Sequence, residues 1–436
     1  MSSTRVPVAV AAPEEAQDIA LATILLLWRQ RMAAFLARYL AGTRGLIWTG
    51  SVSALGYLVL TLAFPLTTWW FRTQDNLATI PLETRWGRFL ASLTGAHPFN
   101  GWMLTLTLAF VVVLFSSQAL ALYAVRTATD KRRAWRIIIG FAIAFLAIQF
   151  WMQPVTSTDL YGYLARSYLI AHQHQNPMVS LASILPGEYI VFARPPAPYG
   201  PLWLLICGLV GVLADSSLML AMMLMKIIVI GAAIATIFMV NWLAERIVPS
   251  QSLTVLVLFA WSPLLIVEAA GNGHNDIVMM ALVMGSLILL LQRRPLFSFP
   301  LLALGVVIKY AVGALIPLWA ALLLMQYCWR LQPGEKFAIQ LPRSRADLRA
   351  LIDHIDRRRV LTIFGGGGAI SLLLIAICYA PFWAGVKTFT GLGKQLGVAN
   401  FTTSPTQLVF TAARLLLPGV DQSLVGSAVR FLFYAL

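Results

Sequence analysis

Long apolar runs, separated by short polar stretches, make up most of the chain. Seven of the runs are long enough to cross a bilayer as helices, because about 20 apolar residues span the hydrocarbon core. They cover residues 45–70, 102–125, 136–153, 217–243, 252–270, 276–292 and 361–384. Lys309 and Tyr310 interrupt a further apolar stretch, 297–328, which therefore predicts two short helices. The pattern predicts an all-α polytopic membrane protein with about eleven to thirteen membrane helices around a cavity.

Three segments depart from this pattern. Residues 19–40 place arginines against leucine, methionine and phenylalanine, which is typical of an amphipathic helix lying along the interface. Residues 154–198 are polar and predict a loop that carries juxtamembrane helices. Residues 199–214 are apolar but too few to cross comfortably and have no basic flank. We therefore expect residues 199–214 to form a short or re-entrant helix.

Composition narrows the class of protein. Of the 436 residues, 59% are hydrophobic and 11% are charged, whereas soluble domains carry about 25% charged residues. A net charge of +15 would suggest nucleic acid for a soluble protein. Here the basic residues gather in loops between apolar runs, so membrane topology explains them and no nucleic-acid partner is expected.

The positions of the cysteines predict neither disulfides nor a metal site. Cys207, Cys328 and Cys378 lie scattered in apolar runs and give neither a disulfide framework nor a metal-ligand spacing. We predict no metal site and no other cofactor, and dependence on a divalent cation stays open.

Basic residues predict which loops face the cytoplasm, since cytoplasmic loops are enriched in Lys and Arg. Three segments concentrate them, residues 29–44, 126–136 and 330–359. With these segments in the cytoplasm, the loop 154–198, the turn 271–276 and Lys309 lie outside. We expect a multi-pass protein of the inner (plasma) membrane whose active site faces outside the cytoplasm.

The same pattern divides the chain into five parts. They are a cytoplasmic tail with the amphipathic helix (1–44), two N-terminal membrane helices (45–135), a membrane module with the external loop 154–198 (136–328), a basic cytoplasmic loop (329–360) and C-terminal membrane helices (361–436). The last part ends inside an apolar run, so a truncation of these helices is an open expectation.

Asp159 is the first candidate catalytic residue. It lies seven residues beyond Met152, at the predicted membrane rim, where a carboxylate is costly to keep. It could be the general base that takes a proton from an acceptor hydroxyl. It also precedes an amphipathic helical stretch, which is a typical N-cap position, or it could pair with Arg166.

A second polar group, Glu268 to Asp276, lies between two apolar runs. Asn275 or Asp276 could cap the following helix. Capping does not explain His274 and Glu268, and polar groups are rarely left at a membrane boundary without a role. Further ligands at metal-site spacing are missing. We expect substrate-binding residues here, with helix capping as the alternative.

Two cations could bind a phosphate. Lys309 interrupts an apolar stretch, and a buried ammonium needs an anion such as a lipid phosphate. A lysine that snorkels from a helix end is the alternative. Arg194 could hold a phosphate through its forked donors, or it could be loop surface.

Several short motifs occur in a characteristic order. They are Asp159-Leu-Tyr-x-Tyr163, Asn176-Pro177, Tyr199-Gly-Pro-Leu-Trp203 and Gly273-His-Asn-Asp276. From about Trp135 to Pro317 the chain resembles the GT-C membrane glycosyltransferases, and among them the polyprenol-phosphate-mannose-dependent α-(1→6)-mannosyltransferases of bacterial envelope lipoglycan synthesis. The resemblance makes 136–328 a GT-C-like catalytic module and implies that Asp159 is the base. Asp159 departs from many GT-C enzymes because it has no adjacent acid.

The resemblance implies an inverting enzyme that moves a hexose, mannose in this family, from a polyprenyl-phosphate carrier to a hydroxyl of a glycolipid or glycan. Its expected partners are membrane lipid, the lipid-linked donor and the acceptor. The expected substrate-binding residues are Arg194, Tyr199, Glu268, His274, Asn275, Asp276 and Lys309. A non-enzymatic transporter or flippase of lipid-linked sugars is the alternative, because buried cations and broken helices fit it too. The long external loop and the lack of an apparent internal repeat favour the enzyme.

Overall fold

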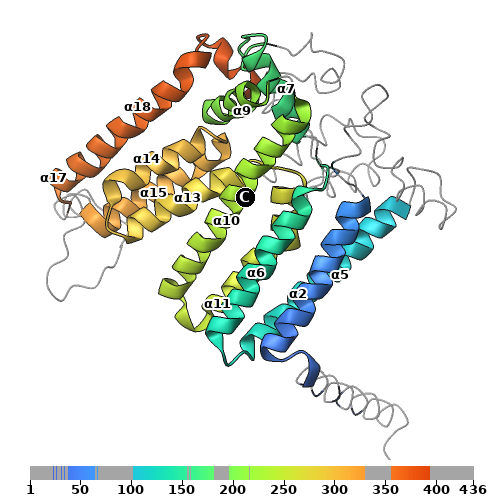
Figure 1. Ribbon diagram of the computed structural model, residues 1–436. Coiled ribbons are helices and arrows are strands. Elements are labelled where there is room, and N and C mark those ends of the chain that lie inside the picture. The colour runs from blue at the N-terminus through green and yellow to red at the C-terminus, as the bar shows by residue number, and fades with distance from the viewer. Residues whose placement is uncertain are drawn as a thin grey trace, which may run out of the picture.

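The structure is a computed structural model, and every regular element in the part of the chain that it describes is a helix (Figure 1). It describes residues 38–63, 102–154, 159–180, 196–215, 217–328 and 355–392, together with Thr23, Leu26, Arg31, Ala34, Leu66 and Ser157. The predicted all-α membrane class is confirmed. Most of the amphipathic helix expected at 19–40, residues 181–195 of the loop 154–198, most of the basic loop 329–360 and the chain beyond residue 392 lie outside the described residues.

The first half of the fold consists of long helices and one pair of short helices. These elements are α2 (Gly42–Ala63), α5 (Trp102–Arg126), α6 (Lys131–Phe150), α7 (Asp159–Ala171), α9 (Pro201–Ala214) and α10 (Leu218–Ile247). Helix α2 packs against both α5 and α6, and α7 packs against α9. Figure 1 shows α7 and α9 together at one end of the molecule, where α6 ends and α10 begins.

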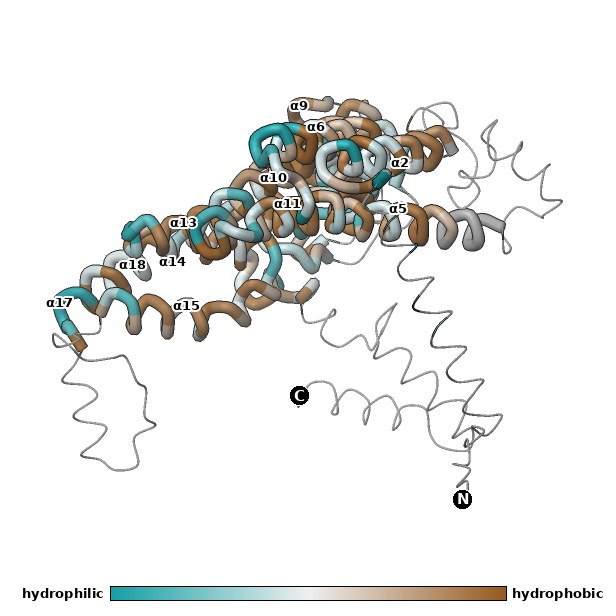
Figure 2. The backbone as a smooth tube through the Cα atoms, turned by 90° about the horizontal axis from the view of Figure 1, so that it is seen from below, coloured by the Kyte–Doolittle hydropathy of each residue, from teal (hydrophilic) through white to brown (hydrophobic). Residues whose placement is uncertain are grey.

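The second half contains shorter and broken helices. They are η2 (Pro249–Gln251), α11 (Ser252–Ala260), α12 (Pro263–Ile266), the π-helix η3 (Val267–Gly271), α13 (Asp276–Leu291), α14 (Pro295–Val306), η4 (Tyr310–Leu315), α15 (Ile316–Leu323), η5 (Leu324–Cys328), α17 (Arg357–Val360), η6 (Leu361–Gly366), α18 (Gly367–Tyr379), η7 (Ala380–Phe382) and η8 (Lys387–Phe389). Helices α13, α14 and α18 pack together beside α10. Figure 2 shows hydrophobic residues along most of these helices and polar residues at α17.

Six helices in the described residues are long and apolar enough to cross a membrane. A seventh span would be the pair Pro249–Ala260 and Pro263–Gly271, which is bent by 46°. Three apolar helices are shorter, namely Pro201–Ala214, Asp276–Leu291 and Pro295–Val306. The count is lower than the predicted eleven to thirteen, and the expected helices beyond residue 392 lie outside the described part of the chain.

The helix boundaries test two predictions about broken segments. The stretch 297–328 is divided at Lys309 into α14 and the run Tyr310–Cys328, which confirms two helices. Helix α9 has 14 residues, a length of about 21 Å at 1.5 Å per residue. Helix α9 is therefore short, as expected. Whether it is re-entrant is not tested.

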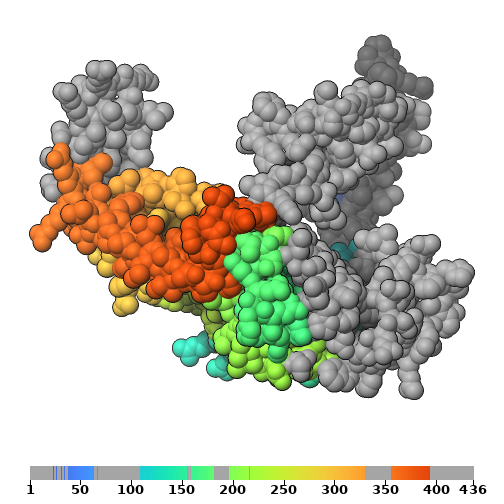
Figure 3. Space-filling model, turned by 90° about the horizontal axis from the view of Figure 1, so that it is seen from above, coloured from blue at the N-terminus to red at the C-terminus, as the bar shows by residue number. Residues whose placement is uncertain are grey.

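A hydrogen bond joins distant parts of the chain at the end of the molecule that carries α7 and α9. Asn176, just beyond α7, donates from its side-chain amide to the carbonyl of Phe382 at 2.7 Å. Figure 3 shows the residues after α7 and those after α18 side by side on this face. The chain just beyond α7 is thus tied to the end of α18, and α7 itself packs against α9.

Candidate active site

The site begins where α6 ends and the chain turns toward α7. Three successive anchors fix this approach. The ammonium of Lys226 donates to the carbonyl of Met152. The hydroxyl of Tyr161 donates to the carbonyl of Pro154 at 3.1 Å. Finally, the Ser157 hydroxyl accepts from the amide of Asp159 at 3.2 Å, so the first residue of α7 has a fixed position.

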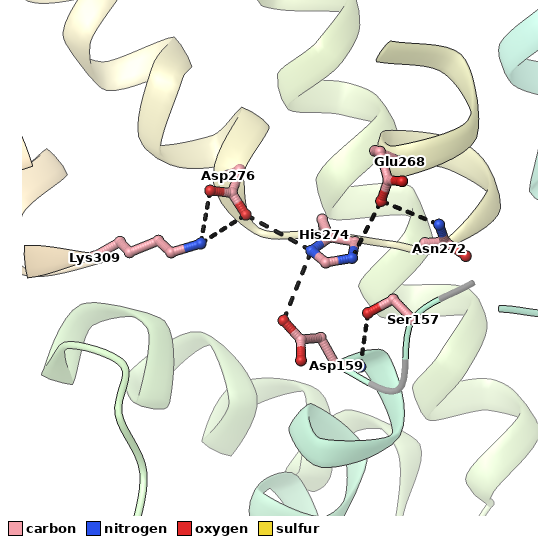
Figure 4. A network of polar contacts seen from close by, with 7 residues as sticks. All are labelled: Ser157, Asp159, Glu268, Asn272, His274, Asp276 and Lys309. Atoms are coloured by element: carbon pink, nitrogen blue, oxygen red, sulfur yellow. Dashed lines mark hydrogen bonds and ion pairs between the residues drawn. The ribbon is translucent and has the colours of Figure 1, made fainter. Parts of the chain in front are cut away.

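The side chain of Asp159 is directed away from its own helix. Helix α7 begins at Asp159, and the nearby hydroxyl that accepts from the Asp159 amide belongs to Ser157. Figure 4 shows the Asp159 carboxylate pointing toward His274. This geometry favours a role in the site over the N-cap alternative, and the role as base stays a prediction.

The second part of the site is a π-helix followed by a tight turn. The π-helix η3 carries Glu268, and single π-turns are frequent at functional sites. The turn closes through the amide of His274, which donates to the Glu268 carbonyl at 3.0 Å. Gly273 has a φ of +69°, a left-handed conformation that glycine adopts without strain. The turn therefore places the side chains of Glu268 and His274 on the same side.

His274 lies among three carboxylates (Figure 4). Its Nε2 atom is 3.2 Å from Oε2 of Glu268. Its Nδ1 atom is 3.7 Å from Oδ2 of Asp159 and also 3.7 Å from Oδ2 of Asp276. Asn272 supports the arrangement, because its amide donates to Glu268 at 3.1 Å.

Lys309 completes the network through Asp276. Its ammonium lies 2.7 Å from Oδ1 and 2.8 Å from Oδ2 of that carboxylate. Lys309 is an extended residue at the break after α14. The amides of Gly200 and Leu202, at the start of α9, donate to the carbonyls of Ile308 and Val307 at 3.0 Å each. The start of α9 therefore holds the break that carries Lys309.

Gly200 is required at this contact for steric reasons. A Cβ atom at Gly200 would lie 2.2 Å from the carbonyl oxygen of Val307. A separation so short does not occur between real atoms, so a side chain would push α9 away from Lys309.

The electrostatics of the site favour a charged imidazole. Burial alone would lower the pKa of His274, but hydrogen bonding to Asp276 and the charges of Glu268 and Asp159 raise it above 6.5 overall. The imidazolium and Lys309 then face three carboxylates. All five groups keep some exposure, from 21% for His274 to 45% for Asp276, so a substrate can reach them.

An aromatic group borders Asp159. The ring centroid of Tyr163 lies 5.1 Å from that of Tyr199 and 4.9 Å from that of Trp203. Burial raises the pKa of the Tyr199 phenol, and the charge of Asp159 raises it further. The phenol therefore stays protonated beside the carboxylate. Arg166 donates to the Gly162 carbonyl at 2.7 Å, and its guanidinium lies 5.4 Å from the centre of the Tyr199 ring.

The remaining expected residues differ in outcome. Asn275 is fully buried, and neither atom of its side-chain amide has a hydrogen-bond partner among the described residues. It stands at the N-cap position of α13 but makes no side-chain cap bond, so that capping hypothesis is not supported. Arg194 lies outside the described residues. Across those that are described, no group of three or more His, Cys, Asp or Glu could hold a metal ion.

Sequence reasoning missed Lys226. Its side chain is fully buried inside α10, where the ammonium donates to the carbonyls of Gln149 (3.2 Å), Phe150 (3.0 Å) and Met152. These carbonyls lie at the negative end of the α6 dipole, which stabilises a cation. The available signal was a single lysine within a long apolar run, the feature that singled out Lys309.

The chain is similar in sequence to known proteins. Residues 54–325 match the family described as "Alpha-(1->6)-mannopyranosyltransferase, N-terminal domain". The chain is 23% identical to alpha-(1->6)-mannopyranosyltransferase A of Mycobacterium tuberculosis, over 58% of this chain and 46% of that protein. It is 21% identical to the Corynebacterium glutamicum protein of the same name, over 64% of this chain and 56% of that protein. The chain thus spans about half the length of these curated relatives. No solved structure matches it significantly.

Proposed function

The chain belongs to the α-(1→6)-mannopyranosyltransferase family, and from this premise we propose that it transfers mannose from a polyprenyl-phosphate carrier to a hydroxyl of a glycolipid or glycan. The transfer takes place on the extracytoplasmic face and inverts the anomeric carbon. The matched range 54–325 contains Asp159, His274 and Lys309.

One observation carries the proposal. A carboxylate at the start of α7, a histidine between two carboxylates, and a lysine after α14 meet in one network, although they are far apart in sequence. A base and a cation close to each other are the groups that glycosyl transfer from a phosphate requires. Both are partly exposed, and both lie beside the external helix pair α7 and α9.

In the proposed reaction, Asp159 takes the proton of the acceptor hydroxyl. The acceptor oxygen attacks the anomeric carbon from the face opposite the phosphate, and the bond between that carbon and the phosphate oxygen breaks. The bonding electrons leave with the phosphate, and polyprenyl phosphate is the second product. Lys309 stabilises the charge that develops on the departing phosphate, and Arg194 is a second candidate for this role.

The remaining polar groups would bind the sugar. Glu268, His274 and Asp276 can accept or donate hydrogen bonds to sugar hydroxyls, and Asn275 and Tyr199 lie beside them in sequence or space. A donor anchored in the membrane suits this location, because nucleotide sugars are scarce outside the cytoplasm. The mannose itself rests on the family.

Transfer from defined donors tests the function. The purified protein is incubated with polyprenyl-phosphate mannose and with the matching glucose and galactose donors, together with a short α-mannoside acceptor. We expect transfer from the mannose donor, and NMR of the product should show the inverted anomeric configuration. Absence of transfer and of hydrolysis from all donors, beside an active control enzyme, would reject the proposal.

The flippase alternative makes a different prediction in cells. An enzyme acting outside leaves unreacted donor in the outer leaflet when its gene is deleted. A flippase leaves the donor in the inner leaflet. Accumulation in the inner leaflet would therefore favour the transporter.

A further inference from the structure

The ion pair between Lys309 and Asp276 is close but open to a competitor. The ammonium contacts both carboxylate oxygens, at 2.7 and 2.8 Å. Asp276 is 45% exposed, more than Asp159 (33%) or Glu268 (38%). Ion pairs with this exposure contribute little to stability. An incoming anion can therefore take the place of this carboxylate at small cost.

The charge balance of the described part of the site favours such an exchange. Three carboxylates already face Lys309 and His274. The phosphodiester of a polyprenyl-phosphate sugar brings a further negative charge. Within the described part of the site each cation already has a carboxylate partner, so the phosphate must share or displace one.

His274 offers the displaced carboxylate a second partner. Its Nε2 side is held by Glu268 at 3.2 Å, which fixes the ring. Its Nδ1 atom is 3.7 Å from Asp159 and 3.7 Å from Asp276. A single N–H forms one short, well-aligned hydrogen bond at a time. A small movement of Asp276 away from Lys309 therefore decides which carboxylate the imidazole binds.

We propose that Asp276 is a resident counter-ion of Lys309 that the donor phosphate replaces, and that the displaced carboxylate closes on His274 and frees Asp159. The proposal rests on the proposed function, because it takes the polyprenyl-phosphate sugar as the donor. In the structure the imidazole lies between Asp159 and Asp276, at 3.7 Å from each. Donor binding then draws it toward Asp276, and Asp159 can accept the proton of the acceptor hydroxyl. Without donor, Asp276 is held by Lys309 and the imidazole stays shared between the two carboxylates.

Binding of polyprenyl phosphate, which is the donor without its sugar, tests the exchange. Calorimetry on the detergent-purified full chain compares the parent with Asp276→Asn, which removes the competing charge and keeps the size. We expect the Kd of Asp276→Asn to fall about two- to fivefold, the scale of one partly exposed charge pair. Glu268→Gln is the matched control, because Glu268 contacts His274 but not Lys309, and its Kd should change less than about twofold.

The outcomes distinguish failure of the counter-ion exchange from failure of the proposed function. Equal gains in both variants would reflect a general relief of negative charge and would overturn the exchange. An unchanged or higher Kd in Asp276→Asn, with a parent that binds, would also overturn it while leaving the proposed function intact. No binding of polyprenyl phosphate to the parent would overturn the donor itself.

A measurement on the unmodified protein avoids dependence on a variant that fails to fold. The ring nitrogens of His274 are observed by ¹⁵N NMR and identified by their loss in His274→Gln. Saturation with polyprenyl phosphate should shift the Nδ1 resonance, because its contact with Asp276 shortens when that carboxylate leaves Lys309. Unchanged ring resonances at saturation would overturn the exchange.

Discussion

At the residue scale, the position of Asp159 favours a role in catalysis over a role in helix capping. The Ser157 hydroxyl accepts from the amide of Asp159, and the Asp159 carboxylate points toward His274. A residue needed only for the fold could be replaced by a similar polar side chain. A base could not, because an amide does not take up the proton.

Asp159→Asn should therefore fold and melt like the parent but lose activity. Asn and Asp favour helix starts about equally, whereas loss of a general base lowers the rate by about 10²–10⁴-fold. Single-turnover transfer from polyprenyl-phosphate mannose measures the rate, and calorimetry should show an almost unchanged Kd for polyprenyl phosphate. Turnover close to that of the parent would contradict the role and turn attention to Glu268 or Asp276.

His274 makes stability depend on pH. Its surroundings raise its pKa above 6.5, so the folded state binds the proton more tightly than the unfolded state. The resulting stabilisation is fully present below about pH 6.5 and is lost as pH rises through the raised pKa. The Tm of the parent should therefore fall toward that of His274→Gln over this range. A constant difference in Tm between the two proteins across it would contradict a charged His274.

At the element scale, the sequence predicts where a helix is interrupted better than it predicts which helices pack together. A lysine interrupts an apolar run at its own position, so the division of residues 297–328 at Lys309 was predictable. The bend of 46° between Pro249–Ala260 and Pro263–Gly271 was not, since residues 252–270 read as one apolar run.

The sequence predicted which residues form the candidate site but not how they are arranged. Polar residues at membrane boundaries identified Asp159, Glu268 to Asp276, and Lys309. That His274 lies among three carboxylates depends on how η3, α7 and α13 pack, and no local pattern encodes this packing. The partners of Lys226 are backbone carbonyls of another helix, which carry no sequence signature at all.

Lys226→Met should impair transfer through the approach to Asp159. Methionine keeps the length of the side chain but leaves the carbonyls at the end of α6 without their donor, at a cost of about 1–3 kcal/mol. We expect a lower kcat and a lower Tm, with partial rescue by Lys226→Arg. Ile227→Met is the control, because Ile227 is exposed on the same helix. Identical kcat and Tm in Lys226→Met and Ile227→Met would contradict this role.

At the scale of the whole molecule, the helix ends separate into two layers. Figure 1 shows the start of α6 and the end of α10 at the end of the molecule opposite to α7. Lys131, Arg132 and Arg133 begin α6, and Arg246 lies in the last turn of α10. These basic residues therefore lie at the end of the molecule opposite to the candidate site, and their cytoplasmic location stays a prediction.

Labelling of single cysteines tests this topology in the cell. Cysteines placed at residues 180–190 and at 345–350, two segments largely outside the described residues, should react from opposite sides of the membrane. The native Cys207, Cys328 and Cys378 are buried, so their background should be low. Reaction of both positions from the same side would contradict the topology and the extracytoplasmic site.

The buried Lys226 also bears on the biogenesis of the protein. Lys226 lies in the third turn of α10, so its insertion costs less than the about 2.5–3.5 kcal/mol of a lysine at a helix centre, but it still favours an early partner. Helix α6 is synthesised before α10, so the carbonyls that bind the ammonium are already in place when α10 leaves the ribosome. We expect the two helices to pair during translation, as an obligatory first step of assembly. Crosslinking of α6 to α10 in nascent chains should decrease in Lys226→Leu, and equal crosslinking would show that the pairing has another cause.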